Sequence, residues 1–200
     1  MNQRNLLDVD WSKIPAPVDD GAAAHLNGMK IPSVGLRATD DTIVTLSTLP
    51  GRTVVFAYPR TGEPGKVALV EDWDMIPGAR GCTPQTCAFR DLYADLKAAG
   101  AAHVFGLSTQ SNAYQTEMAS RLHLPFPVLS DEKLELTRAL ELPTMEVAGL
   151  TLIKRLALII DDTRITHVFY PVFPPDRNAG DVLAWLSDAK VASDRKRMLE

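Results

Sequence analysis

The sequence predicts an α/β sandwich built on a mixed β-sheet. Continuous apolar runs at 53–58 and 103–108 are typical of buried central strands, and a segment with helical periodicity follows each of them. A hairpin pattern and a final helix close the chain. The expected order is β-β-β-α-β-α-β-α-β-β-α, which favours helices packed against a central sheet.

The first elements are an N-terminal arm and a hairpin. Residues 1–28 begin as a polar, proline-containing segment, and we expect a short helix at 22–26 within this arm. Apolar and polar residues alternate at 34–36 and 43–46, which predicts two paired strands that turn around Asp40-Asp41.

A central strand and a long loop follow. Residues 53–58 predict a buried strand that Pro59 ends, and residues 60–81 form a loop rich in glycine and proline. Loops of this length inside a compact domain are usually functional. The pattern then predicts a helix from Pro84 to about Lys97, which Gly100 ends.

The second half continues the alternation of strands and helices. Its expected elements are a strand at 103–108, a helix capped by Ser111 and ending near Leu122, a strand at 126–129, a helix at 133–140 capped by Ser130 or Asp131, a hairpin of 152–160 with 165–170, and a helix at 178–189. We expect residues 29–190 to form one domain and the charged tail at 191–200 to fray.

Composition narrows the function classes. The chain has 200 residues and a net charge of −4, which suits one domain and argues against a nucleic-acid surface. Its apolar runs are much shorter than the ~18 residues of a membrane span. Residues 1–10 lack the apolar core of a signal peptide, so a cytoplasmic location is expected.

Cys82 and Cys87 are the only cysteines, and they lie where the long loop turns into a helix. A thiol at a helix N-terminus faces free backbone N–H groups and the positive end of the helix dipole, which favour the thiolate. Cys82 is therefore the better nucleophile. A second thiol nearby can resolve the product that the first one forms.

Other interpretations of the two cysteines are inert core thiols, a structural disulfide and a metal site. Persistent disulfides are rare in the cytoplasm. The histidines at 25, 103, 123 and 167 are scattered and show no metal-ligand spacing, so no metal is expected.

Four segments of the chain, in the right order, resemble peroxiredoxins of the bacterioferritin-comigratory or Q type. The first is Gly81-Cys82-Thr83-x-Gln85-x-Cys87-Ala88-Phe89-Arg90-Asp91, the active-site segment. The others are 105–108, 126–131 and 152–161, and the similarity covers about residues 30–188. This resemblance implies a thioredoxin-like fold with an N-terminal hairpin extension.

The resemblance also implies a function. Cys82 would reduce hydrogen peroxide or organic hydroperoxides and become a sulfenic acid, and Cys87 would form a disulfide with it. A thioredoxin- or glutaredoxin-like dithiol would recycle the enzyme, with no cofactor. Arg155 would stabilise the Cys82 thiolate and the peroxide oxygens. A monomer or homodimer is expected.

The chain departs from the family pattern Pro-x-x-x-Thr-x-x-Cys. Ala79 stands where the pattern has Thr, and Pro59 lies sixteen residues further upstream than expected, so 60–81 is interpreted as carrying an insertion. Pro59 and Thr83 are the expected substrate-binding residues, and Thr61 is a further candidate for the missing hydroxyl.

Two other functions stay open, a thiol–disulfide oxidoreductase and a non-enzymatic redox sensor or binding module. The spacing of the two cysteines differs from the Cys-x-x-Cys pair of thioredoxin-like reductants. In an ideal helix, Cα atoms five residues apart are separated by about 8–9 Å, beyond the ~7 Å limit for a disulfide. We therefore expect the first turn of this helix to unwind when the disulfide forms, which Pro84 makes easier.

Overall fold

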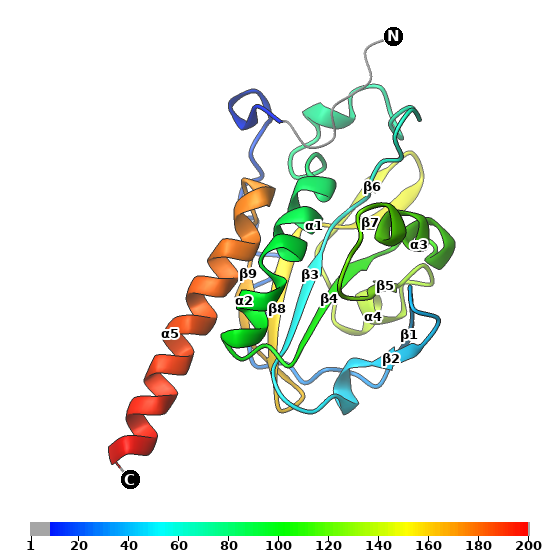
Figure 1. The fold of residues 1–200 in the computed structure, drawn as a ribbon. Helices are drawn as coiled ribbons and strands as arrows, with labels where there is room; N and C mark the ends of the chain where they lie inside the picture. The colour runs from blue at the N-terminus through cyan, green and yellow to red at the C-terminus, as the bar shows by residue number, and fades with distance from the viewer. Residues whose placement is uncertain (1–8, 200) are drawn as a thin grey trace.

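The computed structural model describes residues 9–199, with side chains through residue 191, so part of the N-terminal arm lies outside the described residues. Seven strands form one mixed sheet in the order β2-β1-β5-β4-β3-β8-β9 (Figure 1). They are β1 (Gly35–Ala38), β2 (Ile43–Thr45), β3 (Thr53–Ala57), β4 (His103–Ser108), β5 (Val128–Ser130), β8 (Leu156–Asp161) and β9 (Arg164–Phe169).

The centre of the sheet is parallel and its edges are antiparallel. Strands β3, β4 and β5 run parallel, while β8 pairs antiparallel with β3, and β1 antiparallel with β5. The α-helices are α1 (Cys82–Asp91), α2 (Tyr93–Ala98), α3 (Asn112–Arg121), α4 (Glu135–Ala139) and α5 (Asn178–Leu199). The predicted mixed α/β architecture is confirmed.

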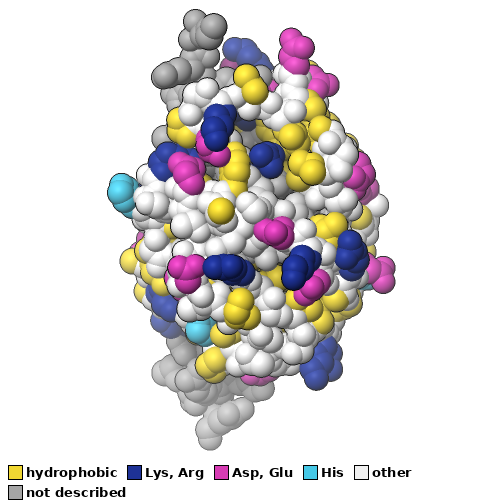
Figure 2. All heavy atoms as spheres, turned by 90° about the vertical axis from the view of Figure 1, so that its right-hand side faces the viewer, with side chains coloured by type: hydrophobic (Ala, Val, Ile, Leu, Met, Phe, Trp, Pro, Cys, Tyr) yellow, Lys and Arg dark blue, Asp and Glu magenta, His cyan; other side chains and the backbone are white. Residues whose placement is uncertain are grey.

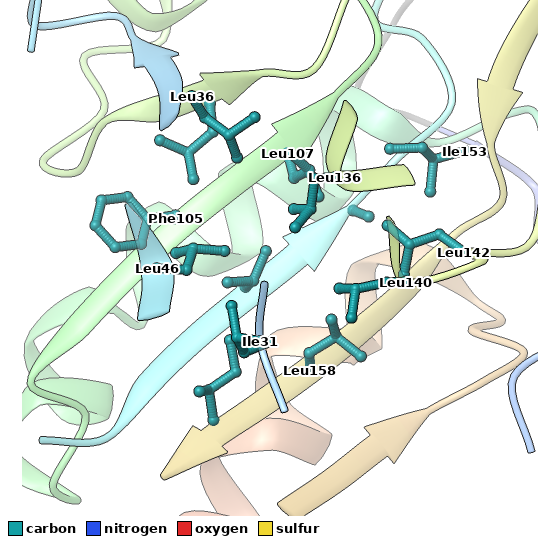
Figure 3. Packing of buried hydrophobic residues seen from close by; sticks show 14 of the residues in the cluster. Ile31, Leu36, Leu46, Phe105, Leu107, Leu136, Leu140, Leu142, Ile153 and Leu158 are labelled. Carbon is teal, nitrogen blue, oxygen red and sulfur yellow. The ribbon is translucent and has the colours of Figure 1, made fainter. Parts of the chain in front are cut away.

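Two hydrophobic cores cover the two faces of the sheet. On one face, α1, α2, α3 and α5 pack on alternate residues of β3, and the ring of Phe56 stacks on that of Phe89 with centroids 4.0 Å apart. On the other face, Leu136 and Leu140 of the α4 segment pack against the opposite residues of β3, β4 and β8 (Figure 3). Successive side chains of a strand point to opposite faces, so the continuous apolar run of β3 fills both cores.

Several local expectations are confirmed by specific contacts. The hairpin of β1 and β2 turns at Asp40-Asp41, and the Ser111 hydroxyl accepts a hydrogen bond from the Tyr114 amide at the start of α3. Of the two caps considered for α4, Asp131 makes the contacts, because its carboxylate accepts from the amides of Leu136 and Thr137 at 3.1 and 2.7 Å.

The expected strand at 152–160 is wrong, because this stretch forms two strands. Strand β7 (Leu150–Ile153) pairs with β6 (Thr144–Val147) in a separate two-stranded sheet, and β8 begins only after Lys154 and Arg155. Ala148 and Gly149 join β6 to β7 with φ angles of 51° and 75°. Two consecutive positive φ angles are typical of a type I′ hairpin turn, and alanine gives no sequence signal for one.

Other element bounds also need correction. The predicted helix at 84–97 begins earlier, at Cys82, and is interrupted at Leu92 into α1 and α2. The strand expected at 126–129 is β5, which begins two residues later and spans Val128–Ser130. Residues 22–26 form turns instead of a helix. Helix α5 extends to Leu199, so the tail expected to fray is helical there, and Figure 1 shows α5 projecting beyond the sheet.

The 60–81 loop packs as a folded unit against the second sheet. It contains the 3₁₀ helix η3 (Trp73–Met75), and Trp73 and Ala79 are buried against Val147 of β6 and Leu152 of β7. The remaining 3₁₀ helices are η1 (Trp11–Lys13), η2 (Leu46–Thr48) and η4 (Pro175–Arg177). The last of these leads directly into α5.

Candidate active site

The two cysteines lie on helix α1, and both belong to the hydrophobic core between this helix and the sheet. Cys82 is the first residue of α1 and Cys87 lies in its second turn, and both are buried free thiols. The residue before them, Gly81, has a φ of 102°, a left-handed conformation that glycine adopts without strain. Both cysteines lie at the start of a helix as expected, although the helix begins at Cys82 itself and not at Pro84.

Arg155 brings a positive charge to the sulfur of Cys82. Its Nη2 donates to Cys82 Sγ at 3.2 Å, and its side chain is buried with only 2% exposed. Arg155 lies in the break between β7 and β8, where the chain leaves one sheet and enters the other. The neighbouring Lys154 instead binds Asp20, with Nζ 2.6 Å from a carboxylate oxygen. The two adjacent cations therefore have separate partners.

Backbone carbonyls at the end of the 60–81 loop hold the guanidinium in place. Arg155 Nη2 lies 3.2, 3.3 and 3.0 Å from the carbonyl oxygens of Gly78, Ala79 and Arg80. The Cys82 thiol also donates to the Ala79 carbonyl at 3.5 Å. Ala79, which stands where the family pattern has threonine, thus contributes its backbone carbonyl to the site.

Gln85 and Asn178 were not identified as site residues from the sequence. The Gln85 side-chain oxygen accepts a hydrogen bond from Arg155 Nη1, and its Nε2 donates to Asn178 Oδ1 at 2.9 Å. Both side chains are buried. Gln85 belongs to the cysteine motif, which is a signal that it is near the site, but Asn178 is 93 positions away and only the fold brings it there.

Two buried polar atoms at this site lack a partner among the described residues. They are Arg155 Nε and Asn178 Nδ2. An unsatisfied buried donor is costly, so each such group calls for a physical explanation, of which a catalytic role is one. Arg155 Nε thus belongs to the guanidinium that contacts the Cys82 sulfur and has no acceptor among the described residues.

The other residues predicted for substrate binding are Thr83, Pro59 and Thr61, and they differ in their position relative to Cys82. Thr83 is buried in the first turn of α1, next to Cys82. Pro59 and Thr61 contact the end of β4 and the residues after it: the Pro59 carbonyl accepts from the Ser108 hydroxyl, and Thr61 binds the side chain of Gln110. The structure therefore brings Arg155 to Cys82, leaves Thr83 next to Cys82 in the chain, and gives Pro59 and Thr61 contacts to other groups.

Burial raises the pKa values of two ionisable side chains near Cys82, the thiol of Cys87 and the phenol of Tyr58. Burial raises the pKa of the Cys87 thiol, with a smaller opposing effect from Arg90. Burial also raises the pKa of Tyr58, and the charge of Cys82 adds to this effect. Tyr58 stays protonated and donates to Gln115 at 3.0 Å. In the reduced protein Cys87 is therefore a poor nucleophile while it stays in the helix.

Comparison with known proteins identifies the family. The family described as Redoxin matches residues 26–183. Chloroplastic peroxiredoxin Q of Oryza sativa subsp. japonica is 33% identical over 158 residues, which are 78% of this chain and 64% of that protein. Chloroplastic peroxiredoxin Q of Sedum lineare is 30% identical over 165 residues, covering 82% of this chain and 78% of the relative.

Solved structures agree with the sequence comparison. Peroxidoxin BcpB of Mycobacterium tuberculosis superposes with a TM-score of 0.63 and 26% identity, covering 80% of this chain and 95% of that one. Peroxiredoxin Q of Xanthomonas campestris, at 22% identity, has a TM-score of 0.64 and shows the fold alone. The chain therefore belongs to the Redoxin family, and within it to the peroxiredoxins of the Q type.

This membership confirms the predicted thioredoxin-like fold. The chain spans a little under two thirds of the length of the rice relative, 64%. None of the helices among residues 9–199 is both long enough and apolar enough to cross a membrane.

Proposed function

We propose that this protein is a thiol-dependent peroxidase in which Cys82 reduces hydrogen peroxide or an organic hydroperoxide. The observation that carries the proposal is the 3.2 Å contact between Arg155 Nη2 and Cys82 Sγ at the first residue of α1. Two positive influences, the guanidinium and the helix N-terminus, act on one sulfur. Its relatives are named peroxiredoxin Q and peroxidoxin, which supports the same chemistry.

The first step transfers one oxygen atom to sulfur. The Cys82 thiolate attacks the terminal peroxide oxygen, an S–O bond forms and the O–O bond breaks. The departing oxygen takes a proton and leaves as water or an alcohol. Arg155 stabilises the negative charge as it moves from sulfur to that oxygen, and its free Nε is the donor available for the peroxide. Thr83, next to Cys82, is the side-chain hydroxyl we assign to peroxide binding.

The second step forms a disulfide between Cys82 and Cys87. The Cys87 sulfur attacks the sulfenic acid sulfur, and the hydroxyl group leaves as water after protonation. The two thiols belong to one continuous helix, so α1 must unwind locally before their sulfurs can bond. Unwinding also removes Cys87 from the burial that raises its pKa, so the same motion positions and activates the resolving thiol.

A dithiol protein of the thioredoxin or glutaredoxin type would then reduce the disulfide by exchange, and no cofactor enters the cycle. Pro59 is retained as a substrate-binding candidate on the resemblance alone. A cytoplasmic location and a monomeric or dimeric state also stay predictions, and the plant relatives are chloroplastic by name.

Peroxide consumption by the reduced protein, coupled to a thioredoxin recycling system, tests the proposal. We expect Cys82→Ser to abolish turnover and Cys87→Ser to accumulate a sulfenic acid that a dimedone reagent labels on Cys82. Absence of peroxide consumption by the wild type would refute the peroxidase. Labelling of Cys87 in Cys82→Ser would instead reverse the roles of the two cysteines.

A further inference from the structure

Part of the N-terminal arm packs on the residue that precedes Cys82. The Trp11 ring is half-buried, and a Cβ atom added at Gly81 would lie only 2.6 Å from it. Pro175 of η4 would lie 2.7 Å from the same Cβ position. The arm, η4 and the start of α1 lie together at one end of the molecule (Figure 1). The start of the cysteine helix is therefore in close contact with two segments that are distant in the chain.

Trp11 is held there by the segment that leads into α5. Its Nε1 donates to the Asp176 carboxylate at 2.9 Å, and its ring meets that of Phe173 edge to face with centroids 6.0 Å apart. Asp10 caps the short helix that Trp11 begins, because its carboxylate accepts from the Ser12 amide at 3.2 Å. The ring position is thus fixed by local structure and by long-range contacts.

A second attachment of the arm lies beside Arg155 in the chain. The Asp20 carboxylate binds Nζ of Lys154, the residue before Arg155, at 2.6 Å. It also accepts from the Tyr170 hydroxyl at 2.7 Å. Residues 11–20, which we call the strap, are therefore attached at both ends.

Between the two attachments, the strap crosses the end of the long loop. A Cβ atom added at Gly78 would lie 3.6 Å from Pro17 Cβ. Gly78 is also the first of the three consecutive residues whose carbonyls accept hydrogen bonds from Arg155, and Gly81 follows the last of them. The strap therefore contacts both ends of the segment that positions the guanidinium and leads into Cys82.

This contact requires the first turn of α1 to be wound. In that turn the Gln85 amide donates to the Gly81 carbonyl at 3.0 Å. A disulfide brings Cys82 and Cys87 closer than a helix allows, so the turn must open. Gly81 is bonded to Cys82 and moves with it, which removes the surface on which Trp11 packs. Docking of the strap and formation of the disulfide therefore compete.

We propose that residues 11–20 are a strap that favours the wound form of α1 and that Trp11 is a positioning residue for disulfide formation. While the strap is docked, Cys82 stays beside Arg155. When the disulfide forms, the strap is released. Because the two events are linked, loss of the strap favours the disulfide, and the disulfide weakens docking of the strap by the same factor. This inference rests on the disulfide step proposed above.

Equilibrium with reduced and oxidised dithiothreitol tests the strap without peroxide. Cys82 and Cys87 give two electrons and two protons to oxidised dithiothreitol, so an S–S bond forms in the protein and one breaks in the reagent. At a fixed ratio of the two reagent forms, we expect the ratio of disulfide to dithiol protein to rise tenfold or more in Trp11→Ala. Trp11→Phe keeps a ring against Gly81 and should stay within threefold of the wild type.

Two controls separate the strap from a general loss of stability. Lys13→Ala changes the same 3₁₀ helix at a side chain that is 79% exposed. Leu46→Ala empties a buried position in the core on the other face of the sheet and destabilises the fold there. Both should keep the wild-type ratio. An unchanged ratio in Trp11→Ala, or an equal rise in Leu46→Ala, overturns the proposal.

The reverse effect is measured on the strap itself. Trypsin cleavage after Lys13, followed by mass spectrometry, should be tenfold or more faster in the disulfide form than in the reduced form. Cys87→Ser exposed to the same reagent should keep the slow rate, and equal rates in the two wild-type forms contradict release. A wild type that forms no disulfide between Cys82 and Cys87 refutes that step and the strap together. A normal disulfide with an unchanged ratio in Trp11→Ala refutes the strap alone.

Discussion

Arg155 shows how one residue connects parts of the molecule that are distant in sequence. Its guanidinium contacts the sulfur of Cys82, three loop carbonyls and the side chain of Gln85. A planar guanidinium has five N–H donors in a fixed arrangement, so it can satisfy several acceptors at once. Lysine carries the same charge but lacks this geometry.

We expect Arg155→Lys to lower the rate of Cys82 oxidation by hydrogen peroxide by about 10²-fold or more, as for loss of one oriented donor in other transition states. Stopped-flow measurement of sulfenic acid formation would check this value. Arg37→Lys, at an exposed position of strand β1, is the control with unchanged rate. A reduction below threefold in Arg155→Lys would contradict a direct role for the guanidinium.

Gly81 is a second residue whose identity follows from its surroundings. A Cβ atom placed there would lie 2.6 Å from the Trp11 ring and 2.7 Å from Pro175, and the φ of 102° is unfavourable for other residues. The N-terminal arm and η4 therefore approach the start of the cysteine helix closely at Gly81.

Gly81→Ala should lower the free energy of unfolding by about 3 kcal/mol, because strained φ and overpacking add together. Gly100→Ala is the matched control, since Gly100 has a φ of 106° but no neighbour within 4 Å, and should cost about 1 kcal/mol. Urea denaturation measures both. Equal losses in the two variants would show that the contact with Trp11 and Pro175 is unimportant.

At the scale of elements, α1 must combine stability with the capacity to unwind. Its buried face includes Phe89, which stacks on Phe56, whereas Pro84 in its first turn has no N–H to donate. Aromatic packing of Phe89 thus anchors the C-terminal half of the helix, so the unwinding that disulfide formation needs is expected in its first turn.

Oxidation to the disulfide should therefore increase hydrogen exchange of the amides at Cys87 and Ala88 by tenfold or more, because their helical hydrogen bonds are lost. The measurement compares the reduced and disulfide forms by hydrogen–deuterium exchange and NMR. Cys87→Ser treated with the same peroxide should keep the reduced pattern. Identical protection in both wild-type forms would exclude the unwinding step.

The contact between β9 and α5 contains a histidine that titrates. His167 stacks on Trp185 with centroids 5.0 Å apart, and burial lowers its pKa from the usual 6.5. The folded state therefore resists protonation more than the unfolded state does. The stabilising contribution is present above about pH 6.5 and is lost as the pH falls through the lowered pKa.

Replacing His167 with phenylalanine keeps an aromatic ring and removes this titration. We expect His167→Phe to lose less stability than the wild type between pH 7 and pH 5, as measured by urea unfolding at each pH. Comparison at pH 8, where the histidine is neutral, corrects for the change in packing. Parallel stability curves for the two proteins would contradict this origin of the acid sensitivity.

At the scale of the whole molecule, the 60–81 loop and the β6–β7 hairpin form a third cluster beside the two main cores. Trp73 is central to it and only 7% exposed. The loop ends in the carbonyls that hold Arg155, so packing far from the sulfur positions the site. Figure 2 shows charges of both signs intermixed over one face of the molecule, with no dominant patch.

We expect Trp73→Ala to lower the free energy of unfolding by about 3 kcal/mol and also to slow Cys82 oxidation, because the loop carbonyls lose their support. Met75→Ala, in the same 3₁₀ helix but 60% exposed, should change neither. Calorimetry and stopped-flow oxidation report the two effects. If Trp73→Ala is destabilised but Cys82 is oxidised at the wild-type rate, packing of this cluster does not control the active site.

The central strands, the hairpin of β1 and β2, and the presence of a helix at the cysteines can be predicted from the sequence, because each depends on a local pattern of apolar residues, caps and turns. It also indicated Cys82, Cys87 and Arg155 through motif resemblance. These patterns are local in the chain, so they can be interpreted without knowledge of the tertiary structure.

Only the tertiary structure decided the β6–β7 hairpin, the packing of the 60–81 loop and the contacts of Gln85, Asn178 and the N-terminal arm. The Ala148-Gly149 turn has no strong local signal, and Asn178 reaches the site because α5 packs beside α1. Contacts between residues far apart in sequence depend on how whole elements pack, and no window of the sequence contains that information.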